Sequence, residues 1–188
     1  MAGHSRPKDG VASARLCPAI HVLLATFPEE PAKENVDARD KPGHDEGILM
    51  PDSAWSLNPQ LKKDTIDIGD LPLSRVLVIK DAHYPWLLLV PRRPEASEII
   101  DLDEVEQAQL MTEISRVGRA LKDITKCDKL NIAALGNVVS QLHVHVIARR
   151  SSDVAWPRPV WGVAPPLEHD PEEVQHFISA LRRKIWLG

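Results

Sequence analysis

The segment from Gln141 to Ile147, which reads Gln-Leu-His-Val-His-Val-Ile, constrains the fold of this 188-residue chain more than any other stretch. Side chains alternate between the two faces of a β-strand, so residues two apart in the sequence share a face. Several β-branched residues in and before the segment favour a strand over a helix. One face of this strand would be apolar and would suit a hydrophobic core. The opposite face would present Gln141, His143 and His145 side by side.

The same segment resembles the signature of the histidine triad (HIT) superfamily of nucleotide hydrolases and transferases, in which three histidines alternate with apolar residues. Two of the three histidines match, as His143 and His145, and Gln141 stands at the first position. The preceding residues 136–140, Gly-Asn-Val-Val-Ser, are similar to the Gly-Gln-Ser/Thr-Val stretch before the triad in that family. The resemblance covers about residues 57–150, so we predict a HIT protein whose first triad histidine is replaced by glutamine.

The resemblance implies a reaction at the α-phosphate of a nucleotide through a nucleotidyl-histidine intermediate. His143, in the middle position, would be the nucleophile, with its Nδ1–H held by the backbone carbonyl of residue 141. His145 would donate a hydrogen bond to the phosphate oxygens or the leaving group. Gln141 can donate a hydrogen bond but cannot carry a proton at neutral pH. We therefore expect the glutamine to alter rate or leaving-group preference more than binding.

The resemblance also implies a set of nucleotide-binding residues. Asp81 ends a predicted strand, and its carboxylate would accept hydrogen bonds from two ribose hydroxyls, with Val78 and Ile79 beside the base. The alternative is an aspartate that caps its own turn.

A second group of nucleotide-binding residues lies in the loop before the triad. Gly136 and the amides of Val138 and Val139 would form a concavity for an anion, and Asn137 would contact the phosphate or the leaving group. For Asn137 the alternative is an ordinary turn residue.

Other side chains have more than one interpretation. The arginines that follow two predicted strands either bind a polyphosphate or form a solvated rim: Arg92, Arg93, Arg149 and Arg150. Trp156 and Trp161 cover the nucleotide, pack on a partner subunit, or fix a proline-rich loop, residues 151–169, to the core.

Sequence periodicity gives the expected elements. Strand patterns occur at 65–68, 75–80, 86–90, 130–135 and 141–149. Asp101 reads as the N-cap of a long helix, with Glu104 in a capping box, and Asp170-Pro171 reads as the start of a C-terminal helix. We predict an α+β domain over residues 50–188, with an antiparallel sheet of about five strands, one long helix and a C-terminal helix in a HIT-like arrangement.

Residues 1–49 differ in composition from the remainder of the chain. They contain several prolines and glycines and scattered charges, which is typical of a segment that buries too little apolar surface to fold. An apolar patch at 17–27 follows basic residues as in a signal peptide, but Pro18 and His21 interrupt it. We therefore expect a disordered N-terminal extension, with Met50 as the natural start of the functional protein.

Composition limits the partners and the compartment. The chain is 43% hydrophobic and 27% charged, and its formal net charge of −4 argues against non-specific nucleic-acid binding. Cys17 and Cys127 lack metal-type spacing, which indicates free thiols in a reducing cytoplasm. No apolar run approaches the ~20 residues of a membrane span. We expect a cytoplasmic protein without nucleic-acid or membrane partners, and the resemblance implies a homodimer.

The predicted activity is hydrolysis or transfer on a nucleoside phosphoramidate or a dinucleoside polyphosphate. No cofactor is expected, although magnesium can arrive with a polyphosphate substrate. Two alternatives remain. The first is a weakly active nucleotide-binding or sensor protein, which the glutamine favours. The second is a metal-binding protein that uses His143 and His145; His83 and His169 are available, but no spacing places a third ligand.

Overall fold

The structure is a computed structural model, and it describes residues 54–187. The predicted N-terminal extension, the domain boundary at residue 50 and Cys17 all lie outside the described residues.

Within residues 54–187, five strands form one sheet: β1 (Thr65–Asp70), β2 (Ser74–Ile79), β3 (Trp86–Pro91), β4 (Lys129–Ala133) and β5 (Val144–Arg149). Their spatial order is β1-β2-β3-β5-β4, so β5 enters the sheet between β3 and β4. Every neighbouring pair is antiparallel. The predicted α+β class and the antiparallel sheet are confirmed. The last strand is shorter than predicted, because residues 141–143 approach the sheet before the regular pairing begins at Val144.

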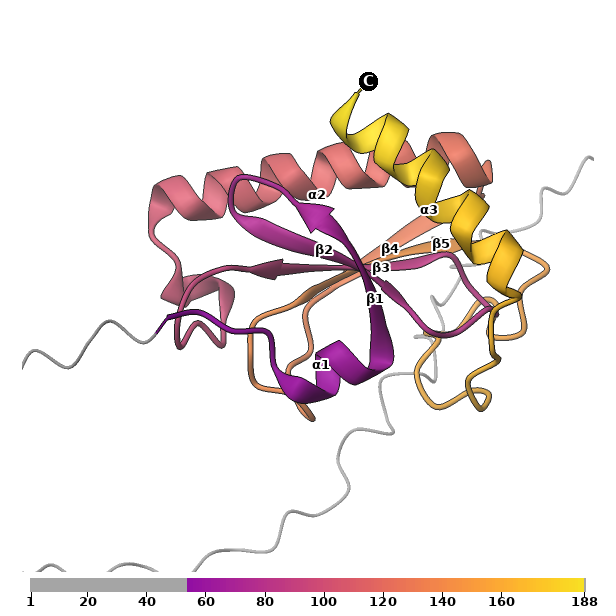
Figure 1. Ribbon diagram of the computed structural model, residues 1–188. Helices are drawn as coiled ribbons and strands as arrows, with labels where there is room; N and C mark the ends of the chain where they lie inside the picture. Colours follow the sequence, from indigo (N-terminus) through magenta and orange to yellow (C-terminus); the bar gives the residue numbers. More distant parts are fainter. Residues whose placement is uncertain (1–53, 188) are drawn as a thin grey trace, which may run out of the picture. The chain divides into compact units, whose positions relative to one another are not determined.

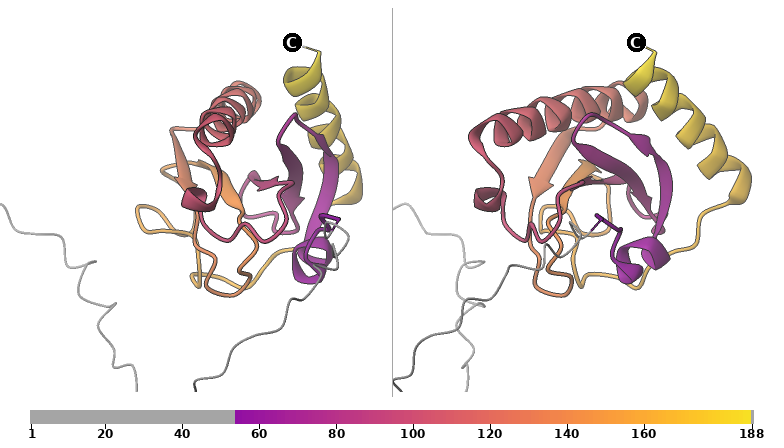
Figure 2. Two further views of the ribbon diagram at one scale, coloured as in Figure 1. Left: turned by 90° about the vertical axis from the view of Figure 1, so that its left-hand side faces the viewer. Right: turned by 60° about the vertical axis from the view of Figure 1, so that its left-hand side comes forward.

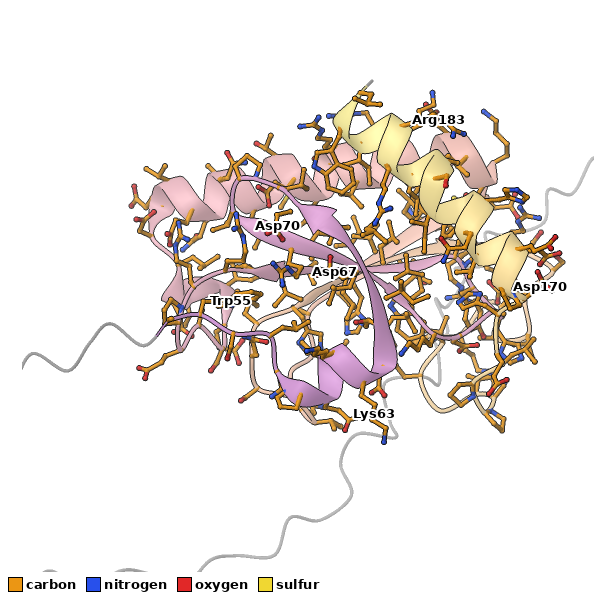
Figure 3. The ribbon with its side chains drawn as sticks, in the orientation of Figure 1. Trp55, Lys63, Asp67, Asp70, Asp170 and Arg183 are labelled. Atoms are coloured by element: carbon orange, nitrogen blue, oxygen red, sulfur yellow. The ribbon has the colours of Figure 1, made fainter. Side chains whose placement is uncertain are left out.

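In the part of the chain that the structure describes, three α-helices accompany the sheet: α1 (Pro59–Asp64), α2 (Glu104–Thr125) and α3 (Pro171–Trp186). The sequence did not reveal α1, because six residues are too short for a hydrophobic period. Asparagine is a common N-cap residue, so Asn58 was a sequence signal for the start of this helix. In the structure Asn58 caps α1 by accepting a hydrogen bond from the Gln60 amide. Helix α3 begins as predicted, where Asp170 accepts from the amides of residues 172 and 173 (Figure 3).

The predicted N-cap of the long helix was wrong by two residues. Asp103 caps α2 and forms the capping box with Glu106. Asp101 instead ends a short 3₁₀ turn, η2 (Ile99–Asp101), where its carboxylate accepts from the amides of Ser97 and Glu98. Acidic residues at both positions gave two possible starts, and local turn geometry decided between them.

The two faces of the sheet are covered differently. Helices α2 and α3 lie on one face, and α1 and the loops that follow β4 and β5 lie on the other side (Figure 1). Val144, Val146 and Ala148 belong to the core under the helices, whereas Ile147 belongs to a second core on the opposite face. The alternation that the sequence predicts for this strand is therefore confirmed.

The two edges of the sheet also differ. Helix α3 covers β1 (Figure 2). Arg182 Nε on this helix donates to the Ile68 carbonyl at 3.0 Å, and Trp186 Nε1 donates to the Asp70 carbonyl at 2.9 Å. Gly69, at φ 140°, lies beneath the Trp186 ring, and a Cβ there would be 3.1 Å from it. At the opposite edge, β4 has no further strand beside it among residues 54–187.

Candidate active site

A cavity of about 440 Å³ lies on the sheet face opposite α2 and α3. Its polar lining comes from three separate elements: Gln60 and Asp64 on α1, Asn137 in the loop after β4, and His143 and His145 at β5. The remaining lining is apolar, and includes two tryptophans from β3 and the loop after β5. This combination of an apolar cavity with a few convergent polar groups is typical of a small-molecule site.

His143 is held by its own backbone. Its Nδ1 lies 2.7 Å from the carbonyl oxygen of Gln141. A carbonyl only accepts hydrogen bonds, so Nδ1 carries a proton, and in the neutral ring Nε2 therefore has the lone pair. The residue is only 7% exposed but lines the cavity. An imidazole with a free Nε2 lone pair beside a cavity can act as a nucleophile.

His145 is held by a different kind of partner. Nε1–H of Trp86 donates to its Nδ1 at 2.9 Å, and its ring centroid lies 5.0 Å from that of His143. Burial lowers the pKa of His145 to about 4, and the neighbouring His143 acts in the same direction. His145 is therefore neutral at pH 7.

The predicted loop residues lie with the two histidines. Gly136, Asn137, Val138 and Val139 all line the cavity. Gly136 adopts φ 78°, a left-handed conformation that favours glycine and turns the chain back toward β5. Val138 is 93% exposed, which is unusual for a valine and leaves its side chain free to contact a ligand.

Gln141 lies close in the sequence to the histidines, but its side chain does not line this cavity. Its Oε1 accepts from the Asn58 amide at 2.9 Å, and its Nε2 donates to the Ser56 carbonyl at 2.9 Å. The amide group thus holds the segment that enters α1. A neutral histidine also has one donor and one acceptor, but they diverge from two sides of a ring, whereas the glutamine amide carries both on one terminal group.

Asp81 also lies outside the cavity. Its Oδ1 accepts from the amides of His83 and Leu167, both at 3.1 Å, and from the His83 ring at 2.7 Å. These contacts match the alternative of a turn aspartate. Of the two hydrophobic residues before it, Ile79 lines the cavity and Val78 lies in the core beneath the helices.

Sequence reasoning missed the carboxylate that does line the cavity. Asp64 ends α1, and its Oδ2 accepts from the Gln60 side-chain amide at 2.6 Å. The Asn58-Pro59 helix start was the available signal, because it would have placed Gln60 and Asp64 one turn apart on the same helix face.

The loop over residues 151–169 is held by a buried arginine. Arg149 is 1% exposed and forms two hydrogen bonds to Asp153, at 2.7 and 2.9 Å, and one to the Arg158 carbonyl at 3.0 Å. It is therefore structural and not a solvated rim residue. The same loop places Trp161 edge-on against His145, with ring centroids 5.3 Å apart, and Trp161 lines the cavity.

The additional histidines considered for a metal have other partners. His83 contacts Asp81, and Nε2–H of His169 donates to the Ile79 carbonyl at 3.0 Å. Within residues 54–187, no three His, Cys, Asp or Glu side chains are grouped so that they could hold a metal ion.

Over the same range, no helix has the length and hydropathy required to cross a membrane.

Comparisons with known proteins give a matching family model and several similar solved structures. The HIT domain family model matches residues 60–152. A histidine triad protein of Bradyrhizobium japonicum is 83% identical, with a TM-score of 0.70, over 71% of this chain and 99% of that chain. Histidine triad proteins of Sinorhizobium meliloti and Marinobacter aquaeolei are 41% and 37% identical, with TM-scores of 0.69 and 0.68. The matches span 98% and 96% of those two proteins, and 71% and 70% of this chain.

A curated relative is more distant. An AP-4-A phosphorylase of Mycobacterium tuberculosis is 32% identical over 80 residues, which are 37% of this chain and 40% of that protein. This chain thus matches only about two fifths of that relative's length. The extensive matches to histidine triad structures, together with the family model, show that the protein belongs to the histidine triad (HIT) family.

Proposed function

We propose that this protein is a nucleotide hydrolase or transferase that acts at an α-phosphate through a nucleotidyl-His143 intermediate. The observation that carries the proposal is the 2.7 Å contact between His143 Nδ1 and the Gln141 carbonyl beside the cavity. That contact fixes the tautomer in which Nε2 can attack phosphorus. It needs only the backbone of residue 141, so a glutamine at the first triad position leaves it intact.

The proposed reaction has two displacements. The Nε2 lone pair of His143 attacks the α-phosphorus, the bond to the leaving group breaks, and its electron pair departs with that group. The cation that forms on the ring is stabilised through Nδ1–H by the Gln141 carbonyl. Water then attacks phosphorus, the P–N bond electrons return to Nε2, and the proton of the water passes to solvent. His145 donates a hydrogen bond to the phosphate oxygens in both steps.

Binding is assigned to the remaining cavity residues. The apolar lining, including Leu61 and Ile79, suits a base, and the cavity volume lies within the ~300–1,000 Å³ of small-molecule sites. We assign the ribose hydroxyls to the Asp64 carboxylate in place of Asp81, because Asp64 lines the cavity. The loop at Gly136 and Asn137 is assigned to the phosphates.

Among the candidate substrates we favour a dinucleoside polyphosphate over a phosphoramidate. A polyphosphate leaves as an anion and needs no proton, whereas an amine must be protonated. His145 is neutral and Gln141 carries no titratable proton, so neither can supply it as an acid. The likeness to an AP-4-A phosphorylase supports the same substrate class. Magnesium would enter with the polyphosphate.

A nucleotide-binding protein of low turnover is the second candidate, and Gln141 is the observation in its favour. Its amide is occupied by residues 56 and 58 and takes no part in the cavity. In that case the side chain at position 141 would hold residues 56 and 58 in place and would have no role in catalysis.

The stereochemistry at phosphorus tests the proposed route. The full chain is incubated, in water enriched in oxygen-18, with a diadenosine polyphosphate that carries a chiral phosphorothioate at the α-position, and the configuration of the isotopically chiral adenosine phosphorothioate product is determined. Two successive in-line displacements give net retention, and we expect retention. Inversion would show direct attack by water and would contradict a covalent intermediate. Binding without turnover would favour the second candidate.

A further inference from the structure

Trp86 and His145 lie on neighbouring strands of the same sheet face. Strands β3 and β5 pair so that Leu88 is opposite His145 and Trp86 is opposite Ile147. Trp86 is thus the diagonal neighbour of His145, within reach of a long side chain. The indole Nε1 lies 2.9 Å from His145 Nδ1, and the two ring centroids are 5.4 Å apart.

The indole nitrogen decides where the histidine proton lies. An indole N–H only donates, so His145 Nδ1 must accept with its lone pair. In the neutral ring the proton is then on Nε2, which is the nitrogen left for a ligand in the cavity. His143 has the opposite arrangement, because a carbonyl faces its Nδ1. One histidine therefore offers a lone pair and the other an N–H, although they are the same side chain two residues apart.

We propose that Trp86 is a positioning residue that holds His145 as a neutral Nε2–H donor toward the substrate phosphate. A proton on Nδ1 would face the indole N–H and leave two buried donors without an acceptor, which is costly. Trp86 thus opposes both the other tautomer and the imidazolium. The role of Trp86 in catalysis rests on the proposed function, whereas the assignment of the His145 tautomer does not.

The surroundings of Trp86 fix its orientation. The ring is buried and makes edge contacts with Tyr84 and Trp161, at centroid distances of 6.3 and 5.7 Å. Trp161 also packs edge-on against His145. The titratable groups that share the cavity with His145 are His143 and Asp64. Neither of these has a hydrogen bond to the His145 ring, so Trp86 is the group that sets its tautomer.

Nuclear magnetic resonance of the full chain tests the tautomer directly. With nitrogen-15 in histidine and tryptophan, we expect at pH 7 an unprotonated Nδ1 and a protonated Nε2 on His145. We also expect a coupling across the hydrogen bond between Trp86 Nε1 and His145 Nδ1. A protonated Nδ1, or an imidazolium at pH 7, would overturn the proposal without any variant being required.

The variant Trp86→Phe tests the contribution of the indole, because it keeps an aromatic ring and removes the donor. We expect the coupling to vanish, the proton to distribute over both nitrogens and the titration midpoint of His145 to rise. Trp161→Phe is the matched control. It also removes an indole N–H beside His145, but one without a hydrogen bond to that ring, so the tautomer should stay as in the wild type. A wild-type tautomer and midpoint in Trp86→Phe would contradict the proposal.

The turnover of Trp86→Phe distinguishes a positioning role of the indole from a role in packing alone. Replacing the hydrogen-bond partner of a metal-ligating histidine costs about 10- to 100-fold in activity, and by analogy we expect a loss of that order in kcat for Trp86→Phe with little change in KM. An altered tautomer with unchanged kcat would refute the catalytic role. An inactive wild type with the expected tautomer would refute the proposed function and leave the tautomer assignment standing.

Discussion

At the scale of single residues, the site depends on which atoms face each imidazole. The alternation of residues 141–148 places His143 and His145 on the same face, and this was predictable from the sequence. The partner of His143 was also predictable, since it is a backbone carbonyl two residues away. The partner of His145 was not, because Trp86 lies 59 positions earlier in the chain and meets it only through strand pairing.

The depressed pKa of His145 makes the folding stability depend on pH. An unperturbed histidine has a pKa of 6.5, and the pKa of folded His145 is about 4, so below pH 6.5 the unfolded chain binds a proton that the folded protein does not. Stability from this group is present above pH 6.5 and is lost as the pH falls toward 4, by at most about 3 kcal/mol. His145→Asn keeps an acceptor for Trp86 but cannot titrate. Urea unfolding at pH 7 and pH 4.5 should show a smaller pH dependence in this variant, and an equal dependence would contradict the assignment.

The two aspartates near the site give a second residue-scale prediction. Asp64→Asn should weaken the binding of adenosine monophosphate by roughly 10- to 100-fold, because hydrogen bonds to a charged group are worth about 1.5–3 kcal/mol. Asp81→Asn is the control, since its carboxylate serves the loop at Leu167 and not the cavity. Isothermal titration calorimetry measures both. A larger loss of affinity in Asp81→Asn would return the ribose role to Asp81.

At the scale of elements, α1 is the part that the sequence did not reveal and the site requires. Strands and long helices can be recognised in a sequence from the period of their apolar residues, whereas a helix of six residues is too short to show one. Its position depends on Gln141, whose side chain holds Ser56 and Asn58 across more than 80 positions of sequence. Gln141 was predicted to stand at the first triad position, but its contacts with residues 56 and 58 could not be predicted from the sequence.

Gln141→Ala should therefore loosen the segment before α1. The change removes two hydrogen bonds to the backbone, each worth about 0.5–1.5 kcal/mol, so we expect the free energy of unfolding to fall by about 1–3 kcal/mol. Hydrogen exchange should accelerate at the Asn58 amide. Gln175→Ala, at an exposed position of α3, is the control. Equal stability of the two variants would show that the contact contributes nothing.

At the scale of the whole molecule, the fold class and the number of strands followed from the sequence, but the order of the strands did not. Three consecutive strands form a meander, as short turns predict, whereas the insertion of β5 between β3 and β4 depends on long-range pairing. That insertion matters for function, because it brings His145 beside Trp86. It also leaves β4 at an edge of the sheet, with Ile132 51% exposed.

The homodimer implied by the resemblance stays a prediction, and the exposed edge gives it a candidate surface. Within residues 54–187 no strand covers β4, and an edge strand with apolar side chains can pair with another chain, so we predict that β4 lies in the dimer interface. Light scattering after size-exclusion chromatography should give a dimer for the wild type and a shift toward the monomer for Ile132→Lys. Lys129→Ile, which removes a charge from the same strand, should not weaken the dimer. A monomeric wild type would contradict the prediction.

The central claim is that His143 forms a covalent bond to phosphorus, and a trapping experiment tests it most directly. Wild type and His143→Ala are incubated with a diadenosine polyphosphate or an adenosine phosphoramidate, quenched in alkali because phosphohistidine is labile to acid, and weighed as intact protein. We predict the mass of one added nucleotidyl group on the wild type and none on the variant, together with release of nucleotide by the wild type alone. An adduct of equal yield on His143→Ala, or turnover by that variant at the wild-type rate, would contradict the claim.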